Sequence, residues 1–176
     1  MHKLKKLIII FALLGSICSI GIYAWLFVDL PSLDTLYQHA AATSTKIVDR
    51  YGRLLYEIAD PHRGKHTPVK LSDIPLYCQQ ATIATEDANY YSHPGVDIVG
   101  ILRAIWINLQ GGEVISGGST ITQQLARNLL LSSEERSQRT LTRKLRESIL
   151  AWRITQQFSK EDILALYLNE VYYGNL

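Results

Sequence analysis

Two adjacent carboxylates, Glu86 and Asp87, stand at the end of a stretch with helical character. The helix macrodipole opposes negative charge at a helix C-terminus, and the two carboxylates repel each other. Both effects disfavour full ionisation of the pair, a condition that suits a general acid or base. The following residues, 93–95 (His-Pro-Gly), predict a sharp turn because a residue before proline favours an extended backbone. A solvated helix end with two surface acids remains the simpler interpretation of these residues alone.

The stretch 117–131, GGSTITQQLARNLLL, could bind an anion or a sugar. Ser119 is the expected N-cap of a helix, and the preceding glycines let backbone N–H groups approach a ligand closely. A spacing of four residues predicts a buried apolar stripe of Ile121, Leu125 and Leu129. Hydrogen-bonding groups fill much of the remaining circumference: Thr120, Gln123, Gln124, Arg127 and Asn128. A face that is merely solvated would more often carry Lys and Glu.

A third stretch, 139–154, combines an apolar stripe with a carboxylate among cations. The stripe expected to be buried consists of Leu141, Leu145, Ile149 and Trp152. Arg143 and Glu147 are neighbours at i, i+4, which fits a plain intrahelical salt bridge. With Lys144 they equally fit a pyrophosphate site in which the carboxylate binds a divalent cation or orients a base. Seven basic residues lie between Arg127 and Arg153, so this segment either attracts anions or forms a solvated helix face.

Hydrophobic periodicity and capping signals place these residues on helices. The expected helices span about residues 75–88, 96–110, 119–131, 138–157 and 160–171. Ser159 with Asp162 fits a capping box before the last helix, and Ser132 with Glu135 fits another. The last helix should face inward through Leu164, Tyr167 and Leu168. Asn169 is the one residue of that helix that could serve a site.

The composition, 47% hydrophobic and 19% charged, excludes a disordered chain. Residues 45–60 predict two short strands around a turn at residues 49–52, and residues 61–72 predict a loop. One mostly helical domain with a small N-terminal β-hairpin is therefore expected. Cys18 and Cys78 have no zinc-like spacing. They also offer no internal disulfide, because Cys18 lies within the apolar run over residues 7–28, which predicts a membrane anchor, and Cys78 lies outside it.

The N-terminus predicts a single-pass membrane anchor over residues 7–28, which contain no charge. Lysines at positions 3, 5 and 6 precede this run, so residues 1–6 should form a cytoplasmic tail. A linker over residues 29–44 and an exported domain over residues 45–176 would follow. A cleaved signal peptide is the alternative, but the run exceeds the usual length of about 7–15 residues and lacks a clear A-x-A site.

Four stretches together resemble glycosyltransferase family 51, the peptidoglycan polymerase domain of class A penicillin-binding proteins and monofunctional transglycosylases. The family motif E-D-x-x-F-x-x-H-x-G is matched by Glu86, Asp87, Tyr90 (for Phe), His93 and Gly95. The motif G-x-S-T-x-T-Q-Q is matched by Gly117, Ser119, Thr120, Thr122, Gln123 and Gln124. R-K-x-x-E is matched by Arg143, Lys144 and Glu147, and K-x-x-I-L-x-x-Y-L-N by Lys160, Ile163, Leu164, Tyr167, Leu168 and Asn169.

This resemblance implies a lysozyme-like, mostly helical fold with membrane-proximal helices. It implies polymerisation of lipid II into β-1,4-linked glycan strands during cell wall synthesis, with undecaprenyl pyrophosphate leaving and the anomeric centre inverting. Glu86 would be the general base, and Glu147 would assist pyrophosphate departure through a divalent cation, Mg²⁺ or Mn²⁺. Asp87 would tune Glu86 or brace the cleft. The implied substrate-binding residues are Asp87, His93, Ser119, Thr120, Gln123, Gln124, Arg127, Asn128, Arg143, Lys144 and Asn169.

The implied location is the bacterial inner (cytoplasmic) membrane, with the catalytic domain on the periplasmic side. The expected partners are lipid II, the growing glycan chain, the bilayer and other cell-wall synthesis proteins, with no nucleic acid among them. The sequence departs from the family at Ala165 and Thr155, where acidic residues are frequent, and no fifth motif follows the fourth. We therefore expect a C-terminally truncated domain. Two other functions stay open: a lytic transglycosylase or hydrolase, and a truncated, non-catalytic membrane protein that binds lipid II.

Overall fold

The computed structural model describes residues 2–34, 36, 44–58, 67–111 and 117–170. These residues are mostly helical with one two-stranded sheet, so the predicted fold class is confirmed at that level. The likeness to lysozyme stays a prediction. Residues 61–66 of the predicted loop, and half of the predicted linker, lie outside the described residues.

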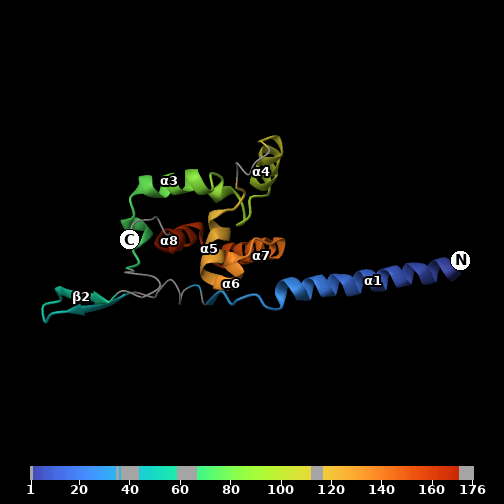
Figure 1. Cartoon of the computed structure of the whole chain (residues 1–176), viewed down its shortest axis with the longest axis horizontal. Coiled ribbons are helices and arrows are strands. Elements are labelled where there is room, and N and C mark those ends of the chain that lie inside the picture. Colours follow the sequence, from blue (N-terminus) through green and yellow to red (C-terminus); the bar gives the residue numbers. More distant parts are fainter. Residues whose placement is uncertain (1, 35, 37–43, 59–66, 112–116, 171–176) are drawn as a thin grey trace.

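A helical body lies between two projecting elements (Figure 1). The long helix α1 (His2–Phe27) projects from one side, and the hairpin of β1 (Thr45–Val48) and β2 (Leu54–Ile58) projects from the other. The body contains α3 (Leu76–Glu86), α4 (Ile98–Gly111), α5 (Ile121–Leu130), α6 (Ser133–Ser137), α7 (Leu141–Gln157) and α8 (Lys160–Glu170). One-turn 3₁₀ helices at Leu71–Asp73 and Tyr90–Ser92 precede α3 and α4.

The five predicted helices of the body correspond to α3, α4, α5, α7 and α8, with ends that differ by three residues or fewer. The short helix α6 was not predicted as a helix, although its capping box of Ser132 and Glu135 was, and that box is present. The box of Ser159 and Asp162 before α8 is also confirmed. Local capping signals therefore locate these helix starts correctly.

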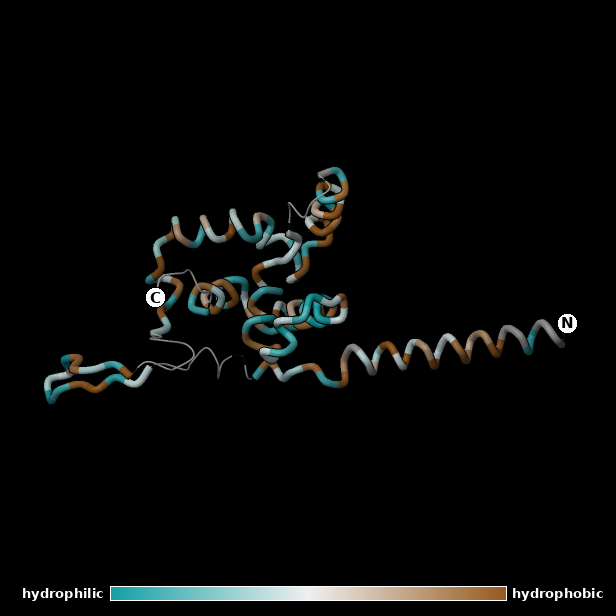
Figure 2. Tube along the Cα trace, in the orientation of Figure 1, coloured by the Kyte–Doolittle hydropathy of each residue, from teal (hydrophilic) through white to brown (hydrophobic). Residues whose placement is uncertain are grey.

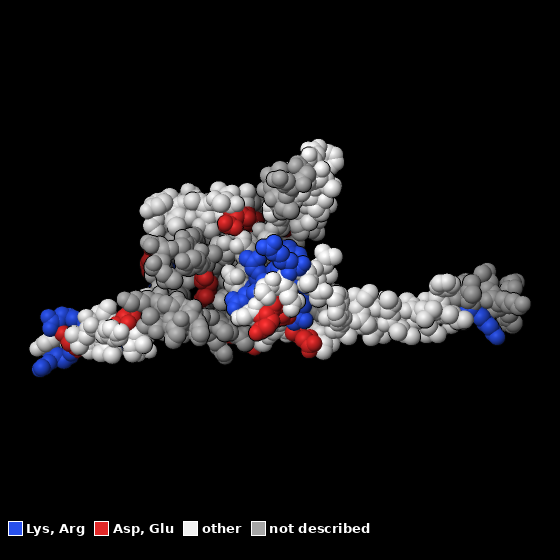
Figure 3. All heavy atoms as spheres, in the orientation of Figure 1, with Lys and Arg blue, Asp and Glu red and all other residues white. Residues whose placement is uncertain are grey.

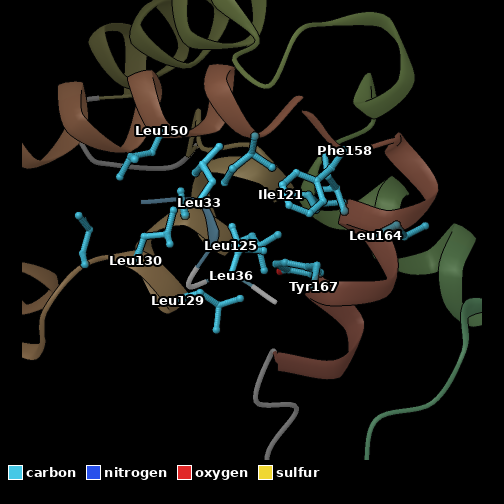
Figure 4. Close-up of a cluster of buried hydrophobic side chains, with 14 of the residues drawn as sticks. Leu33, Leu36, Ile121, Leu125, Leu129, Leu130, Leu150, Phe158, Leu164 and Tyr167 are labelled. Atoms are coloured by element: carbon cyan, nitrogen blue, oxygen red, sulfur yellow. The ribbon is translucent and has the colours of Figure 1, made fainter. Parts of the chain in front are cut away.

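Helix α5 lies at the centre of the body and packs against α7 and α8. Its predicted apolar stripe is confirmed, because Ile121, Leu125 and Leu129 are all buried. Around it, α7, its C-cap and α8 contribute Leu150, Ile154, Phe158, Ile163, Leu164 and Tyr167 to the same cluster (Figure 4). Burial of each large apolar side chain stabilises the fold by about 1.5–3 kcal/mol, so this cluster fixes the position of α5.

The stripe predicted to be buried on α7 is wrong. Leu141 is 84% exposed, Leu145 and Trp152 are about half exposed, and the inward face carries Glu147 and Leu150 instead. Counting apolar residues favoured the wrong face, because a carboxylate paired with two cations can be buried where an unpaired one cannot. The inward face of α7 is therefore partly ionic.

Part of the segment predicted as a linker belongs to the core. Leu33 and Leu36 are buried against the central cluster (Figure 4). Arg146 on α7 also donates a hydrogen bond from Nη2 to the backbone oxygen of Asp29 at 2.7 Å. The chain just after α1 is thus attached to α7.

The hairpin forms as predicted. Strands β1 and β2 pair antiparallel, with Thr45 opposite Ile58. The Asp49 carboxylate accepts hydrogen bonds from the backbone N–H groups of Tyr51 and Arg53, and these bonds lower the pKa of Asp49. Gly52 has a φ of 79°, which a side chain would disfavour. The turn chemistry therefore sets the register of the two strands.

Apolar residues run along α1 and α4 (Figure 2). Within the described part of the chain, no helix combines the length and the apolar content of a membrane span. The anchor over residues 7–28 stays a prediction.

The corrected orientation of α7 can be tested by a pair of substitutions. We expect Leu150→Ala to lower the free energy of unfolding by about 2–5 kcal/mol, because it leaves a cavity beside α5. Leu141→Ala should change it by less than about 0.5 kcal/mol, because that side chain is exposed. Urea unfolding followed by circular dichroism measures both, and equal losses would contradict this orientation.

Candidate functional site

Asp87 is the buried member of the carboxylate pair. Its Oδ2 accepts a hydrogen bond from the backbone N–H of Ile121 at 3.1 Å, at the first turn of α5. Its Oδ1 lies 2.8 Å from Nε2 of His93, which is also buried. The positive end of the α5 macrodipole and the imidazole both favour a carboxylate here. Asp87 therefore joins the end of α3 to the start of α5.

Glu86, the last residue of α3, is exposed. Its Oε2 accepts a hydrogen bond of 2.7 Å from Nε2 of Gln124 on α5. The Oε1 of the same Gln124 accepts a hydrogen bond of 3.1 Å from the hydroxyl of Tyr167 on α8. Among the described residues no hydrogen bond reaches Oε1 of Glu86, so that oxygen can accept a proton from a bound substrate.

Thr120, and not Ser119, is the N-cap of α5, so the predicted cap is wrong by one residue. Thr120 and Gln123 form the capping box, and the Thr120 hydroxyl also donates to the backbone oxygen of Gly95 at 2.6 Å. Gly95 has a φ of 89°, and a Cβ there would lie 2.6 Å from the backbone oxygen of Ala151. Only glycine fits this close approach of the 93–95 turn to α7.

Ser119 instead belongs to the cationic side of the site. Its hydroxyl accepts a hydrogen bond of 2.7 Å from Nζ of Lys144 on α7. The same ammonium group reaches Oε1 of Gln123 at 3.3 Å, and Nε2 of Gln123 donates to the Ser148 hydroxyl at 2.8 Å. Burial lowers the pKa of Lys144, and the neighbouring Glu147 carboxylate partly opposes that shift. The ammonium group is thus held by hydroxyl, amide and carboxylate oxygens, and an anionic ligand could replace some of these contacts.

Glu147 is 1% exposed and lies between two cations of its own helix. Arg143 donates to Oε1 of Glu147, and Nζ of Lys144 lies 3.5 Å from Oε2. The plain salt bridge that the sequence allowed is therefore present, but it is buried beside α5 instead of solvated. Removal of both cations would leave an uncompensated buried charge.

Basic side chains gather on one face of the body, around α7 (Figure 3). Arg127 is half-buried on α5 and near enough to Lys144 to lower its pKa. No hydrogen bond or ion pair links the Arg127 guanidinium to another described residue. Asn128 is half-buried one residue further on, and its backbone oxygen accepts from Arg136 at 3.0 Å. Arg127 is thus the predicted phosphate ligand with the fewest competing partners.

Asn169 lies apart from these groups and binds the backbone. Its amide exchanges two hydrogen bonds with Val69, at 2.8 and 2.9 Å, and donates to the oxygen of Ala165 at 2.7 Å. The structure thus brings ten of the twelve other predicted residues around the start of α5, while Arg127 and Asn128 lie nearer its C-terminal end.

Lys160 and Tyr167 were not predicted as site residues. Nζ of Lys160 donates to the His93 oxygen at 2.8 Å and lies 4.4 Å above the Tyr90 ring. Burial lowers the pKa of Lys160 and raises that of Tyr90. Both Lys160 and Tyr167 fall within the fourth family motif, which was the available signal for them.

The two sides of the site are chemically different. One offers an exposed carboxylate oxygen on Glu86, and the other offers Arg143 and Lys144 beside buried Glu147, with Arg127 near Lys144. An exposed carboxylate can remove a proton from a hydroxyl group, and clustered cations can neutralise a departing phosphate. Such an arrangement suits the transfer of a group from a phosphate to a hydroxyl.

Comparison with known proteins agrees with this chemistry. The family model described as "Transglycosylase" matches residues 51–176. Penicillin-binding protein 1A of Vibrio cholerae is 39% identical, over 98% of this chain and 20% of its own length. The proteins of that name from Escherichia coli and Aquifex aeolicus are 43% and 38% identical, over 92% and 98% of this chain. The chain spans about a fifth of the length of these relatives.

The different roles of the two adjacent carboxylates can be separated by stability. Asp87→Ala should lower the free energy of unfolding by about 2–4 kcal/mol, because it leaves the Ile121 N–H and the His93 ring without their acceptor. Glu86→Ala, the matched control, removes an exposed side chain and should cost less than about 1 kcal/mol. Urea titrations of both variants measure the difference, and the reverse order would refute this assignment.

Proposed function

The chain belongs to the transglycosylase family, and from that membership we propose that it is a peptidoglycan glycosyltransferase that polymerises lipid II. In this reaction the disaccharide of one substrate is transferred to a sugar hydroxyl of another, and undecaprenyl pyrophosphate is released. Because the chain spans about a fifth of its relatives, their further activities are not assigned to it.

The observation that carries this proposal is the position of α5 between two unlike groups. Gln124 holds the exposed carboxylate of Glu86, while its neighbour Gln123 contacts Lys144 and Ser148 on α7. A hydroxyl acceptor on the Glu86 side and a pyrophosphate on the α7 side would then lie on either side of one helix. A lytic enzyme or hydrolase needs no such pyrophosphate site.

The proposed chemistry uses the side chains in these positions. Oε1 of Glu86 takes the proton of the acceptor's 4-hydroxyl as that oxygen attacks the anomeric carbon of the donor. The bond between the anomeric carbon and the pyrophosphate oxygen breaks, with inversion. Lys144, Arg143 and Arg127 stabilise the negative charge of the leaving pyrophosphate. Ser119 and Gln123 position Lys144 before the substrate binds.

A divalent cation remains part of the proposal for Glu147. The described residues do not fit a cation held by the protein alone, because they contain no group of three His, Cys, Asp or Glu side chains suited to a metal. Both Glu147 oxygens face cationic side chains. Glu147 could contribute one ligand if substrate phosphate oxygens supply the others, as is common for Mg²⁺. We therefore assign no step to the cation.

We further propose that α1 anchors the chain in the bacterial inner membrane, with the domain on the periplasmic side. The support is the charge-free run over residues 7–28 and the 26-residue length of α1, which reaches about 39 Å. Other cell-wall synthesis proteins stay candidate partners. The lytic and non-catalytic alternatives become outcomes of the experiment below.

The central test is polymerisation of fluorescent lipid II by the purified full chain in detergent with Mg²⁺. We expect Glu86→Gln to reduce glycan synthesis by a factor of about 10² or more, because the base is lost. Glu134→Gln, which changes an exposed carboxylate on α6, is the matched control and should retain activity.

Three results would contradict this proposal. Anhydro-sugar products released from finished peptidoglycan would indicate a lytic enzyme. Lipid II binding without turnover would indicate a non-catalytic protein. Polymerisation that survives Glu86→Gln would remove the base from its assigned role.

The proposed topology can be tested with the two native cysteines. In spheroplasts, a membrane-impermeant maleimide should label Cys78, which is half-buried on α3, and should leave Cys18 unlabelled within the bilayer. Cys78→Ser should abolish the labelling and Cys18→Ser should preserve it. Labelling of Cys78 only after lysis would place the domain in the cytoplasm and contradict the proposal.

A further inference from the structure

We propose that Gln124 and Tyr167 are positioning residues for Glu86. The Tyr167 hydroxyl fixes the side-chain amide of Gln124, and that amide fixes one oxygen of the Glu86 carboxylate. The role of Glu86 as the base rests on the proposed function, but the hydrogen-bonded chain itself does not.

The chain connects three helices that are distant in sequence. The Tyr167 hydroxyl on α8 donates to Oε1 of Gln124 on α5 at 3.1 Å. Nε2 of Gln124 donates to Oε2 of Glu86, at the end of α3, at 2.7 Å. The second bond has a charged acceptor, so it is the stronger of the two.

The direction of the two hydrogen bonds follows from donor and acceptor chemistry. An ionised carboxylate only accepts, so the Gln124 amide must present Nε2 to Glu86. Its Oε1 then needs a donor, which the Tyr167 hydroxyl supplies. Rotation of the amide by half a turn would place Oε1 against the carboxylate and break the stronger bond. Tyr167 therefore stabilises the productive orientation of Gln124.

The inner end of this chain is held by the core. The Tyr167 ring is 2% exposed and lies among the apolar side chains of α5 and α8 (Figure 4). Its hydroxyl therefore has a fixed position. Glu86, in contrast, is exposed at a helix end and has three rotatable side-chain bonds. Among the described residues, Gln124 is the one side chain that holds the Glu86 carboxylate to this core.

The result is a carboxylate with two unlike oxygens. Oε2 is held by Gln124, and Oε1 is available to the acceptor hydroxyl. Asp87, the adjacent carboxylate, is turned away toward His93 and Ile121. Because a small displacement of a base lowers the rate strongly, loss of the positioning bonds should act on turnover more than on substrate binding.

The first test is spectroscopic and needs no activity. The side-chain ¹⁵N–¹H₂ signal of Gln124 in the full chain in micelles is assigned by its absence in Gln124→Met. Its proton chemical shift should be that of an amide proton bonded to a carboxylate. This shift should move toward the free-amide position in Tyr167→Phe. Tyr90→Phe is the matched control, because it removes another buried hydroxyl, the one bonded to Lys160, and should leave the signal in place. An unchanged signal in Tyr167→Phe would overturn the proposal.

The second test is kinetic, with lipid II as the substrate. Tyr167→Phe should lower kcat about three- to tenfold with KM unchanged, the range expected for loss of one neutral hydrogen bond. Gln124→Met should lower it by about tenfold or more, because the bond it loses is charge-assisted. Tyr167→Phe should cause no further loss of kcat in the Gln124→Met variant, because Tyr167 acts through Gln124.

The outcomes separate the two proposals. Losses of kcat that multiply in the double variant, or a raised KM with unchanged kcat, would overturn the positioning role. A wild-type chain that makes no glycan would refute the proposed function, while the amide signal would still decide whether Tyr167 fixes Gln124. Melting temperatures of the three single variants identify any loss that comes from unfolding.

Discussion

The buried contact between Asp87 and the first turn of α5 is the interaction on which the site depends. It places the end of α3 against the helix that carries Gln123 and Gln124, and His93 and the 93–95 turn complete the junction. A carboxylate at a helix N-terminus is in a favourable field, whereas one at the C-terminus of its own helix is not. The two adjacent carboxylates therefore have different environments: one is buried at the junction, and the other is exposed at the surface.

A second constraint is the burial of Glu147. A carboxylate at 1% exposure requires partners, and Arg143 and Lys144 on the same helix supply them. This ionic group occupies the inward face of α7 next to α5, so Leu141 and Trp152 point outward. The cationic character of the site and the exposed apolar side chains of α7 thus have one cause.

Local chemistry allowed much of the fold to be predicted, and long-range contacts explain what could not be. The starts of α6 and α8 and the turn of the hairpin follow from capping boxes and from Gly52, which act within a few residues. The orientation of α7 depends on a buried ion pair, and the burial of Leu33 depends on a distant helix. The sequence predicted Gln124 as a substrate-binding residue, but its hydrogen bond to Tyr167 spans 43 positions and could be seen only in the folded chain.

The consecutive glutamines of α5 determine how the two sides of the site are oriented relative to each other. Neighbouring side chains on a helix diverge by about 100°, and here that angle separates the carboxylate side from the cationic side. No loop separates the two glutamines. A single-residue insertion before them in the first turn of α5 would therefore rotate both side chains away from their partners. The angle between the carboxylate side and the cationic side is therefore set by the helical pitch of α5.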